Sequence, residues 1–154
     1  MPEHHLPENP HAAQLAAAQV PGELWPHFAE YGLGTMVEHM GIVFSELSPK
    51  RSVAKFPVSR NTQPAGLVHG GAYVALAETL GSMSANLHGG DQRLAVGVDV
   101  NATHTRGARS GWVTGTCTAI HLGQTVTVHE IVMTDDRGRR LSTARITNAL
   151  IDRS

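Results

Sequence analysis

The sequence is poor in cysteine and in charge. Its one cysteine, Cys117, excludes an internal disulfide and a zinc site built from several thiolates. We expect this thiol to be buried, because it lies in the strand-like Gly-Thr-Cys-Thr-Ala segment 115–119. Only 16% of the residues are charged, against about 25% in a typical domain. This shortage suggests that a partner subunit covers part of the surface.

An excess of charge of one sign and long apolar runs are also missing. The chain has 12 basic and 13 acidic residues, for a net charge of -1. Its overall charge therefore gives no electrostatic reason to expect binding to nucleic acid or to an anionic membrane. No window approaches the roughly 18 apolar residues that a membrane-spanning helix needs. The first 20 residues lack the basic start and apolar core of a secretory signal. A cytoplasmic protein is therefore the default expectation.

Several catalytic motifs are absent as well. His129-Glu130 does not continue into H-E-x-x-H, and no Cys/His cluster occurs, so the sequence predicts no metal site. The G-x-S-x-G elbow of serine hydrolases is missing. The absence of G-x-G-x-x-G and of a P-loop argues against redox chemistry with a nucleotide cofactor and against nucleotide hydrolysis. We therefore expect no cofactor.

A length of 154 residues suits one domain. Residues 1–20 are expected to form a loosely ordered lead, and residues 21–154 the single domain. The first part of that domain predicts a short helix over 22–31 and strands over 38–47 and 51–58. Apolar residues then recur at helical spacing and predict a long helix over about 70–87. They are Ala72, Leu76, Leu80, Met83 and Leu87.

The rest of the chain is rich in Val, Thr and Ile and is divided by turn signals. It predicts four strands, over residues 93–105, 111–121, 124–134 and 140–151. Strands in sequence around one long helix favour an α+β fold, with an antiparallel sheet packed on that helix.

Glu78 is the only charged residue between Asn61 and Gly90. At 100° per residue it points roughly opposite Leu76, among small or apolar neighbours. Such a face is expected to be covered, which would partly desolvate the carboxylate and suit it to general-base or nucleophilic work. The alternatives are a glutamate that reaches water or one that pairs with an arginine of a neighbouring strand.

The start of the predicted helix is the second candidate feature. Gly70 and Gly71 would place backbone N–H groups at the positive end of the helix dipole, where an oxyanion could bind. His69 would either bond an acyl group or cap the helix, and Gln63 lies in the loop before it. Gly70 and Glu78 are about 12 Å apart along one helix, too far to share one reacting carbon. Either they serve different purposes, or two antiparallel helices of a two-fold dimer bring them together.

The segment Gln63-x-x-Gly66-Leu67-x-His69-Gly70-Gly71-Ala72 with Leu76-Ala77-Glu78 resembles the hotdog-fold acyl-CoA thioesterases of the phenylacetic-acid-pathway and hydroxybenzoyl-CoA type. Residues 98–106 and 121–123 are most similar to the 1,4-dihydroxy-2-naphthoyl-CoA thioesterases of menaquinone synthesis. The likeness covers about residues 41–151. It implies a hotdog fold, in which the sheet wraps around the helix and continues across a homodimer, and commonly a homotetramer.

The resemblance also implies roles for the matched residues. Glu78 would attack the thioester carbonyl or activate water, and the Gly70 N–H would bind the carbonyl oxygen. His69 and Gln63 would orient the thioester or the water. Ser82, one turn after Glu78, would hold the hydrolytic water.

Other matched residues would bind the substrate. They are Gly97, His104, Thr105, Arg106, Gly107, His121, Leu122, Gly123, Gln124 and Thr125. Arg106 and Arg109 are suited to the phosphates of coenzyme A, although either could be a solvated turn charge. His104 and His121 could equally be structural residues at strand ends. Val68, Tyr73 and Met83 are expected at the floor of the acyl pocket.

The implied reaction converts an aromatic acyl-CoA and water into the acid and free coenzyme A. Two alternatives stay open, a hotdog hydratase or dehydratase and a non-catalytic acyl-CoA binding module. Within the thioesterases, the acyl group and the choice between CoA and a carrier protein also stay open.

Overall fold

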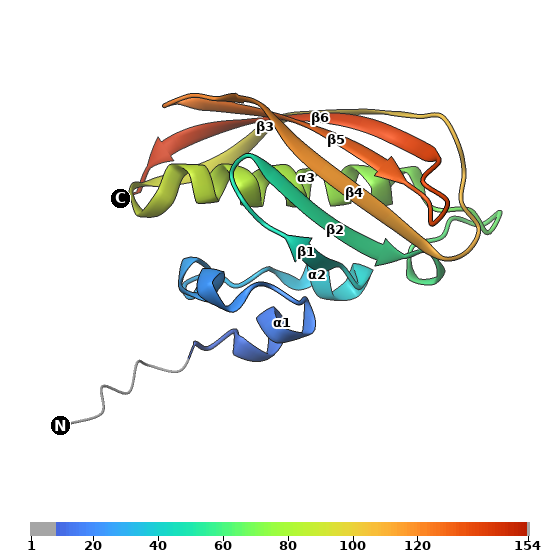
Figure 1. The fold of residues 1–154 in the computed structure, drawn as a ribbon, viewed down its shortest axis with the longest axis horizontal. Coiled ribbons are helices and arrows are strands. Elements are labelled where there is room, and N and C mark those ends of the chain that lie inside the picture. The colour runs from blue at the N-terminus through green and yellow to red at the C-terminus, as the bar shows by residue number, and fades with distance from the viewer. Residues whose placement is uncertain (1–8, 154) are drawn as a thin grey trace.

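The computed structural model describes residues 9–153. Six antiparallel strands form one sheet that curves over a single long helix, α3 (Gly70–Gly89) (Figure 1). The strand order is β1-β2-β4-β5-β6-β3. The strands are β1 (Val43–Glu46), β2 (Arg51–Pro57), β3 (Arg93–His104), β4 (Trp112–Leu122), β5 (Val126–Thr134) and β6 (Arg140–Asp152). The predicted hotdog architecture is confirmed.

Helix α3 packs closely against the sheet. Leu76 and Leu80 are fully buried, as the apolar spacing predicts. Gly81 faces Ile146 on β6 so closely that an added Cβ would overlap the Ile146 Cγ2. Gly81 therefore lets the backbone of α3 approach the sheet closely. This close packing fixes the orientation of the helix, and with it the direction in which the polar side chains of α3 point.

Strand β3 forms one edge of the sheet, and among residues 9–153 it pairs with β6 alone. Its side chains are more exposed than those of the inner strands, with Val96 at 41% and Val98 at 62% exposure. An edge strand of this length with exposed valines offers unpaired N–H and C=O groups to a further strand.

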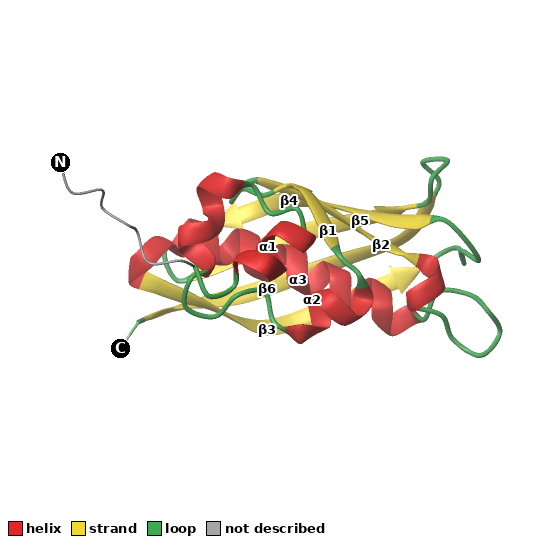
Figure 2. Cartoon of the chain, turned by 90° about the horizontal axis from the view of Figure 1, so that it is seen from below, coloured by secondary structure: helices red, strands yellow, loops and turns green. Residues whose placement is uncertain are grey.

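A helical segment before the sheet covers the opposite side of α3 (Figures 1 and 2). It comprises α1 (Ala12–Ala17), the 3₁₀ helix η1 (Gly22–Phe28) and α2 (Thr35–Met40). Two further 3₁₀ turns, η2 (Val58–Arg60) and η3 (Gly90–Gln92), flank α3 in the chain. None of the helices formed by residues 9–153 is long and apolar enough to span a membrane.

Two predictions for this region are wrong. The lead expected over residues 1–20 is ordered from residue 9 onwards, because α1 buries Leu15 completely in the core; residues 1–8 lie outside the described residues. The strand expected over 38–47 begins only at Val43, because residues 35–40 form α2. Gly41 ends α2 with a φ of 69°, the left-handed conformation that commonly closes a helix.

Candidate active site

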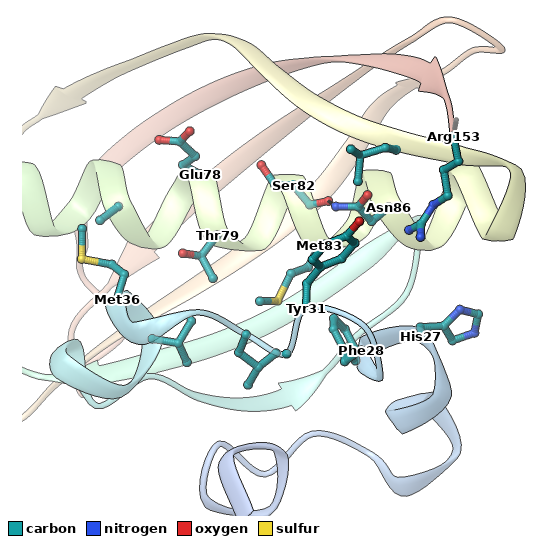
Figure 3. Close-up of a pocket in the computed structure, with 15 residues that line it drawn as sticks. His27, Phe28, Tyr31, Met36, Glu78, Thr79, Ser82, Met83, Asn86 and Arg153 are labelled. Atoms are coloured by element: carbon teal, nitrogen blue, oxygen red, sulfur yellow. Dashed lines mark hydrogen bonds between the residues drawn. The ribbon is translucent and has the colours of Figure 1, made fainter. Parts of the chain in front are cut away.

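Glu78 and Ser82 project from the same side of α3, toward the sheet, while Thr79 and Met83 project toward the helical segment (Figure 3). Glu78 lies next to Gly97 on β3, where an added Cβ would be 3.3 Å from Glu78 Oε1. The glycine thus leaves room for the carboxylate beside the edge strand. Within this single chain Glu78 is exposed, and no arginine of the described residues forms a salt bridge with it. The expected covering of the carboxylate is therefore not provided by its own chain.

Ser82 is held from the sheet side. Its hydroxyl donates to Asn148 Oδ1 on β6 over 3.2 Å. Asn148 is fully buried, and its Nδ2 has no hydrogen-bond partner within residues 9–153. Leaving a buried N–H unpaired costs roughly 1–3 kcal/mol. Sequence reasoning did not select Asn148, although it occupies an inward-facing strand position between the buried Ile146 and Leu150.

The start of α3 gathers a second group of the predicted residues. His69 is the N-cap, and its Nδ1 accepts the N–H of Gly71 over 2.8 Å. His69 thus caps the helix through its Nδ1, as the capping alternative predicts, and its Nε2 takes no part in the cap. Gly70 is the first residue of the helix, so no acceptor within the helix is available to its N–H. His104 lies beside it, since an added Cβ at Gly70 would be 3.0 Å from His104 Nε2.

The loops around this helix end are held by backbone and local bonds. Gln63 Oε1 accepts the Ala65 N–H over 2.7 Å. His104 Nδ1 lies 2.8 Å from Ser142 Oγ, which holds the imidazole at the end of β3. Arg109 donates to the Ala65 carbonyl over 2.9 Å, so its guanidinium supports the loop. Residues 105–107 continue the exposed loop after β3, which includes Thr105, Arg106 and Gly107.

The remaining predicted residues lie at the other end of α3. His121 and Leu122 end β4, and Gly123, Gln124 and Thr125 form the turn to β5. His88, in the last turn of α3, bonds the Gly123 carbonyl over 2.9 Å. A 20-residue helix is about 30 Å long. A single chain therefore keeps the segments 104–107 and 121–125 at opposite ends of α3, as Figure 1 shows.

A pocket of about 410 Å³ opens between α3 and the helical segment (Figure 3). Phe28, Tyr31 and Met36 line one side of it, Thr79 and Met83 the other, and Glu78 and Ser82 also border it. Of the three residues expected at the pocket floor only Met83 lines it. Val68 and Tyr73 are instead buried in the core, with 5% and 2% exposure. The helical segment was missed as a pocket wall because its apolar residues show no clear period.

Two buried groups are unsuited to catalysis. Cys117 is buried as predicted, and burial raises the pKa of its thiol to about 11, so it stays protonated. His129 on β5 is fully buried, and desolvation lowers its pKa. Within residues 9–153 no three His, Cys, Asp or Glu side chains gather to hold a metal ion.

The chain is similar in sequence to known thioesterases. Residues 65–142, just over half of the chain, match the family described as the thioesterase superfamily. The "Proofreading thioesterase EntH" of Cronobacter sakazakii is 46% identical over 120 residues, which cover 77% of this chain and 88% of that protein.

Solved structures are similar as well. A glutamine-to-alanine variant of thioesterase PA1618 from Pseudomonas aeruginosa is 39% identical, with a TM-score of 0.75, covering 96% of this chain and 98% of that one. Two structures of SAV0944 from Staphylococcus aureus are 30% and 31% identical, with TM-scores of 0.72 and 0.71. They cover 77% and 76% of this chain and 99% and 98% of the other. One carries alanine at a glutamate, and the other carries alanine at a glutamine 15 positions earlier.

Proposed function

The chain belongs to the thioesterase superfamily and is a thioester hydrolase, and we propose that it hydrolyses an aromatic acyl-CoA with Glu78 as its catalytic carboxylate. The observation that carries this proposal is the placement of Glu78 and Ser82, one turn apart, at the border of an apolar pocket. The acyl groups that we favour are 1,4-dihydroxy-2-naphthoyl, which would place the enzyme in menaquinone synthesis, and hydroxybenzoyl.

In this proposal Glu78 either removes a proton from the attacking water or attacks the thioester carbonyl as a nucleophile. In both routes the thiolate of coenzyme A leaves, and in the second route water then hydrolyses the mixed anhydride, which releases the acid and restores the carboxylate. No metal is required for this displacement. Ser82 holds the hydrolytic water, and Gln63 orients the water or the thioester. Gln63 and Glu78 are 15 residues apart, the same spacing as the two positions replaced by alanine in the SAV0944 structures.

The carbonyl oxygen binds the Gly70 N–H of a second subunit. Glu78 and Gly70 of one chain are about 12 Å apart along α3, so one chain does not hold both at one carbonyl. The exposed edge of β3 lies beside Glu78, and pairing of two such edges around a two-fold axis would run the α3 helices antiparallel. The shared site of a homodimer, which further assembles as a homotetramer, would complete the oxyanion site and cover the carboxylate. His69 would orient the acyl group through its Nε2.

Coenzyme A would lie where the start of α3 in one subunit is close to the end of α3 in the other. One chain supplies Gly97 and His104 of β3 and, in the loop that follows, Thr105, Arg106 and Gly107. The other supplies the turn before β5, with His121, Leu122, Gly123, Gln124 and Thr125. The exposed Arg106 guanidinium is available for a phosphate, whereas Arg109 already bonds a carbonyl.

The acyl group would enter the pocket beside Glu78. Its volume of about 410 Å³ lies in the usual range of roughly 300–1,000 Å³ for small-molecule sites. Phe28, Tyr31, Met36 and Met83 give it aromatic and sulfur-containing walls, which favour a flat aromatic ring. The ring would thus contact the helical segment, which precedes the family match at residues 65–142.

A proofreading thioesterase is the second candidate function, because a relative with 46% identity bears that name. Such an enzyme would release acyl groups that were attached in error, on coenzyme A or on a carrier protein. It would therefore accept many acyl groups with similar kcat/KM, whereas a pathway enzyme would prefer one.

Thiol release from a panel of thioesters tests the proposal. The panel contains 1,4-dihydroxy-2-naphthoyl-CoA, hydroxybenzoyl-CoA, phenylacetyl-CoA and aliphatic acyl-CoAs of short and medium length, with one aryl group also on a carrier protein. We expect kcat/KM to be at least tenfold higher for aromatic than for aliphatic acyl groups. A preference for aliphatic groups would overturn the aromatic assignment, and a flat profile over the aryl groups would favour proofreading.

A further inference from the structure

We infer that Asn148 is a positioning residue, whose side-chain oxygen holds the Ser82 hydroxyl hydrogen so that Ser82 Oγ faces the reacting water as an acceptor. This inference rests on the proposed function, in which Ser82 holds the hydrolytic water. Asn148 lies on β6, outside the residues that match the family.

The first support is the position of Asn148 in the sheet. It pairs with Gly97 on β3 and with Thr127 on β5, so it lies at the same level of the sheet as Glu78. An added Cβ at Gly97 would be 3.3 Å from Glu78 Oε1 and 3.8 Å from Asn148 Oδ1. The Asn148 amide therefore lies on the sheet side of Glu78 and Ser82, the two residues of α3 to which the proposed reaction assigns roles.

The second support is the direction of the hydrogen bond. The Ser82 hydroxyl has one hydrogen, and it donates that hydrogen to Asn148 Oδ1 over 3.2 Å. The lone pairs of Ser82 Oγ are then free to accept from a water molecule in the pocket. Such a water would donate one hydrogen to Glu78 and the other to Ser82. Its own lone pair would remain for the bond to carbon.

The third support is that the amide is poorly satisfied where it lies. Asn148 is fully buried, and Nδ2 has no partner within residues 9–153. The neighbouring inward positions of β6 hold the apolar Ile146 and Leu150, so a leucine would be the ordinary residue here. A buried amide that makes one bond and leaves another unmade indicates a role other than stability.

If the amide were reversed, Nδ2 would donate to Ser82 Oγ instead. Ser82 would then have its own hydrogen free, and the Glu78 carboxylate, one turn earlier on the same face of α3, would be available to accept it. That bond would compete with the water for both Ser82 and Glu78. The orientation of Asn148 thus decides whether Ser82 assists the water or blocks it.

A double-mutant cycle with hydroxybenzoyl-CoA as substrate tests the inference. Asn148→Leu keeps the approximate shape and removes the acceptor, and we expect it to lower kcat on the order of tenfold with KM changed less than about twofold. Asn148→Asp keeps an acceptor oxygen, so its kcat should exceed that of Asn148→Leu, while the second carboxylate near Glu78 keeps it below the wild-type value. In a Ser82→Ala background, Asn148→Leu should change kcat less than about twofold, because Asn148 acts through Ser82.

Ser84→Ala is the matched control, since Ser84 is a buried serine of the same helix that bonds Ser52 over 2.7 Å on the far side from the pocket. It should leave kcat unchanged. Thermal unfolding reports on folding, and Asn148→Ala takes the place of Asn148→Leu in the same cycle if the leucine variant does not fold.

Three results would overturn the inference: wild-type kcat in Asn148→Leu, equal losses in the leucine and aspartate variants, or additive losses in the cycle. Failure of the proposed function gives a different pattern. In that case Ser82→Ala or Glu78→Gln would itself retain wild-type kcat, whatever the Asn148 variants show.

Discussion

Replacing Gly70 by proline removes one backbone N–H from the start of α3, and we expect it to lower kcat by about 10²- to 10³-fold. Gly70 is the first residue of the helix, a position where proline is readily accommodated because its missing N–H has no partner in the helix. His69 before it has φ -66° and ψ 132°, the extended conformation that a following proline favours. The change therefore deletes the donor without ending the helix.

The magnitude follows from the proposed contact with the carbonyl oxygen. Loss of one backbone donor to an oxyanion costs roughly 2.7–4 kcal/mol of transition-state stabilisation, which corresponds to that fall in kcat. Gly70→Ala is the control, because it adds a Cβ and keeps the N–H. This Cβ would be 3.0 Å from His104 Nε2, the end of a side chain that can shift slightly. We therefore expect kcat of the alanine variant to stay within about fivefold of the wild type.

Initial rates of thiol release from hydroxybenzoyl-CoA give kcat and KM for both variants, and thermal unfolding checks that both fold. A proline variant that matches the alanine variant in kcat would refute the assignment of the Gly70 N–H as the oxyanion donor.

Three further predictions follow from the same structure. Glu78→Gln keeps the shape and removes the charge, so kcat should fall by at least about 10² while hydroxybenzoyl-CoA still binds, as measured by calorimetry; a kcat near that of the wild type would contradict the role of the carboxylate. Val98→Lys places a charge on the exposed edge of β3, so light scattering should show a monomer with little activity; an active dimer would exclude this edge as the interface. Burial lowers the pKa of His129 in the folded chain below its value of 6.5 in the unfolded chain. The stability that the buried, neutral imidazole contributes is therefore complete above pH 6.5 and is lost as the pH falls from 6.5 through the lower pKa of the folded chain. Urea unfolding between pH 7.5 and 5 should show this decline, and His129→Gln should reduce it; equal declines in both proteins would show that another group is responsible.

The main elements of the fold could be predicted from the sequence because each has a strong local signal. The apolar residues of α3 recur at helical spacing, and Leu76 and Leu80 are buried accordingly. The four strands after Asp91 are rich in Val, Thr and Ile and are separated by turn signals, and their predicted bounds lie within two residues of β3 to β6. In each case local pattern and tertiary packing favour the same structure.

The helical segment could be predicted only in part, since the sequence predicts a helix over residues 22–31, where the structure has the 3₁₀ helix η1, but it predicts neither α1 nor α2. The elements of this segment have six or seven residues, too few to establish a period, and their helices depend on burial of Leu15, Phe28 and Val37 in the core. Gly41 was the one local signal for the end of α2, since glycine commonly follows the last turn of a helix. The pocket walls Phe28, Tyr31 and Met36 were missed for the same reason.

The candidate site was predicted in part. Glu78 stood out because it is an isolated charge, and Ser82 followed from its spacing of four residues. Asn148 was not selected, because its importance depends on a contact between β6 and α3 that spans 66 positions in the sequence. A polar residue at an inward position of an alternating strand was the available signal.

Complementation between inactive subunits tests the shared site most directly. Glu78→Ala and Gly70→Pro subunits are each expected to be nearly inactive as homodimers, and after subunit exchange a heterodimer would contain one site with both an intact Glu78 and an intact Gly70. We expect the mixture to recover up to about a quarter of wild-type activity, since half of the dimers are mixed and each holds one intact site. Mixed dimers that form, as shown by mass spectrometry, and remain as inactive as the parent variants would contradict a site built from the carboxylate of one subunit and the glycine N–H of the other.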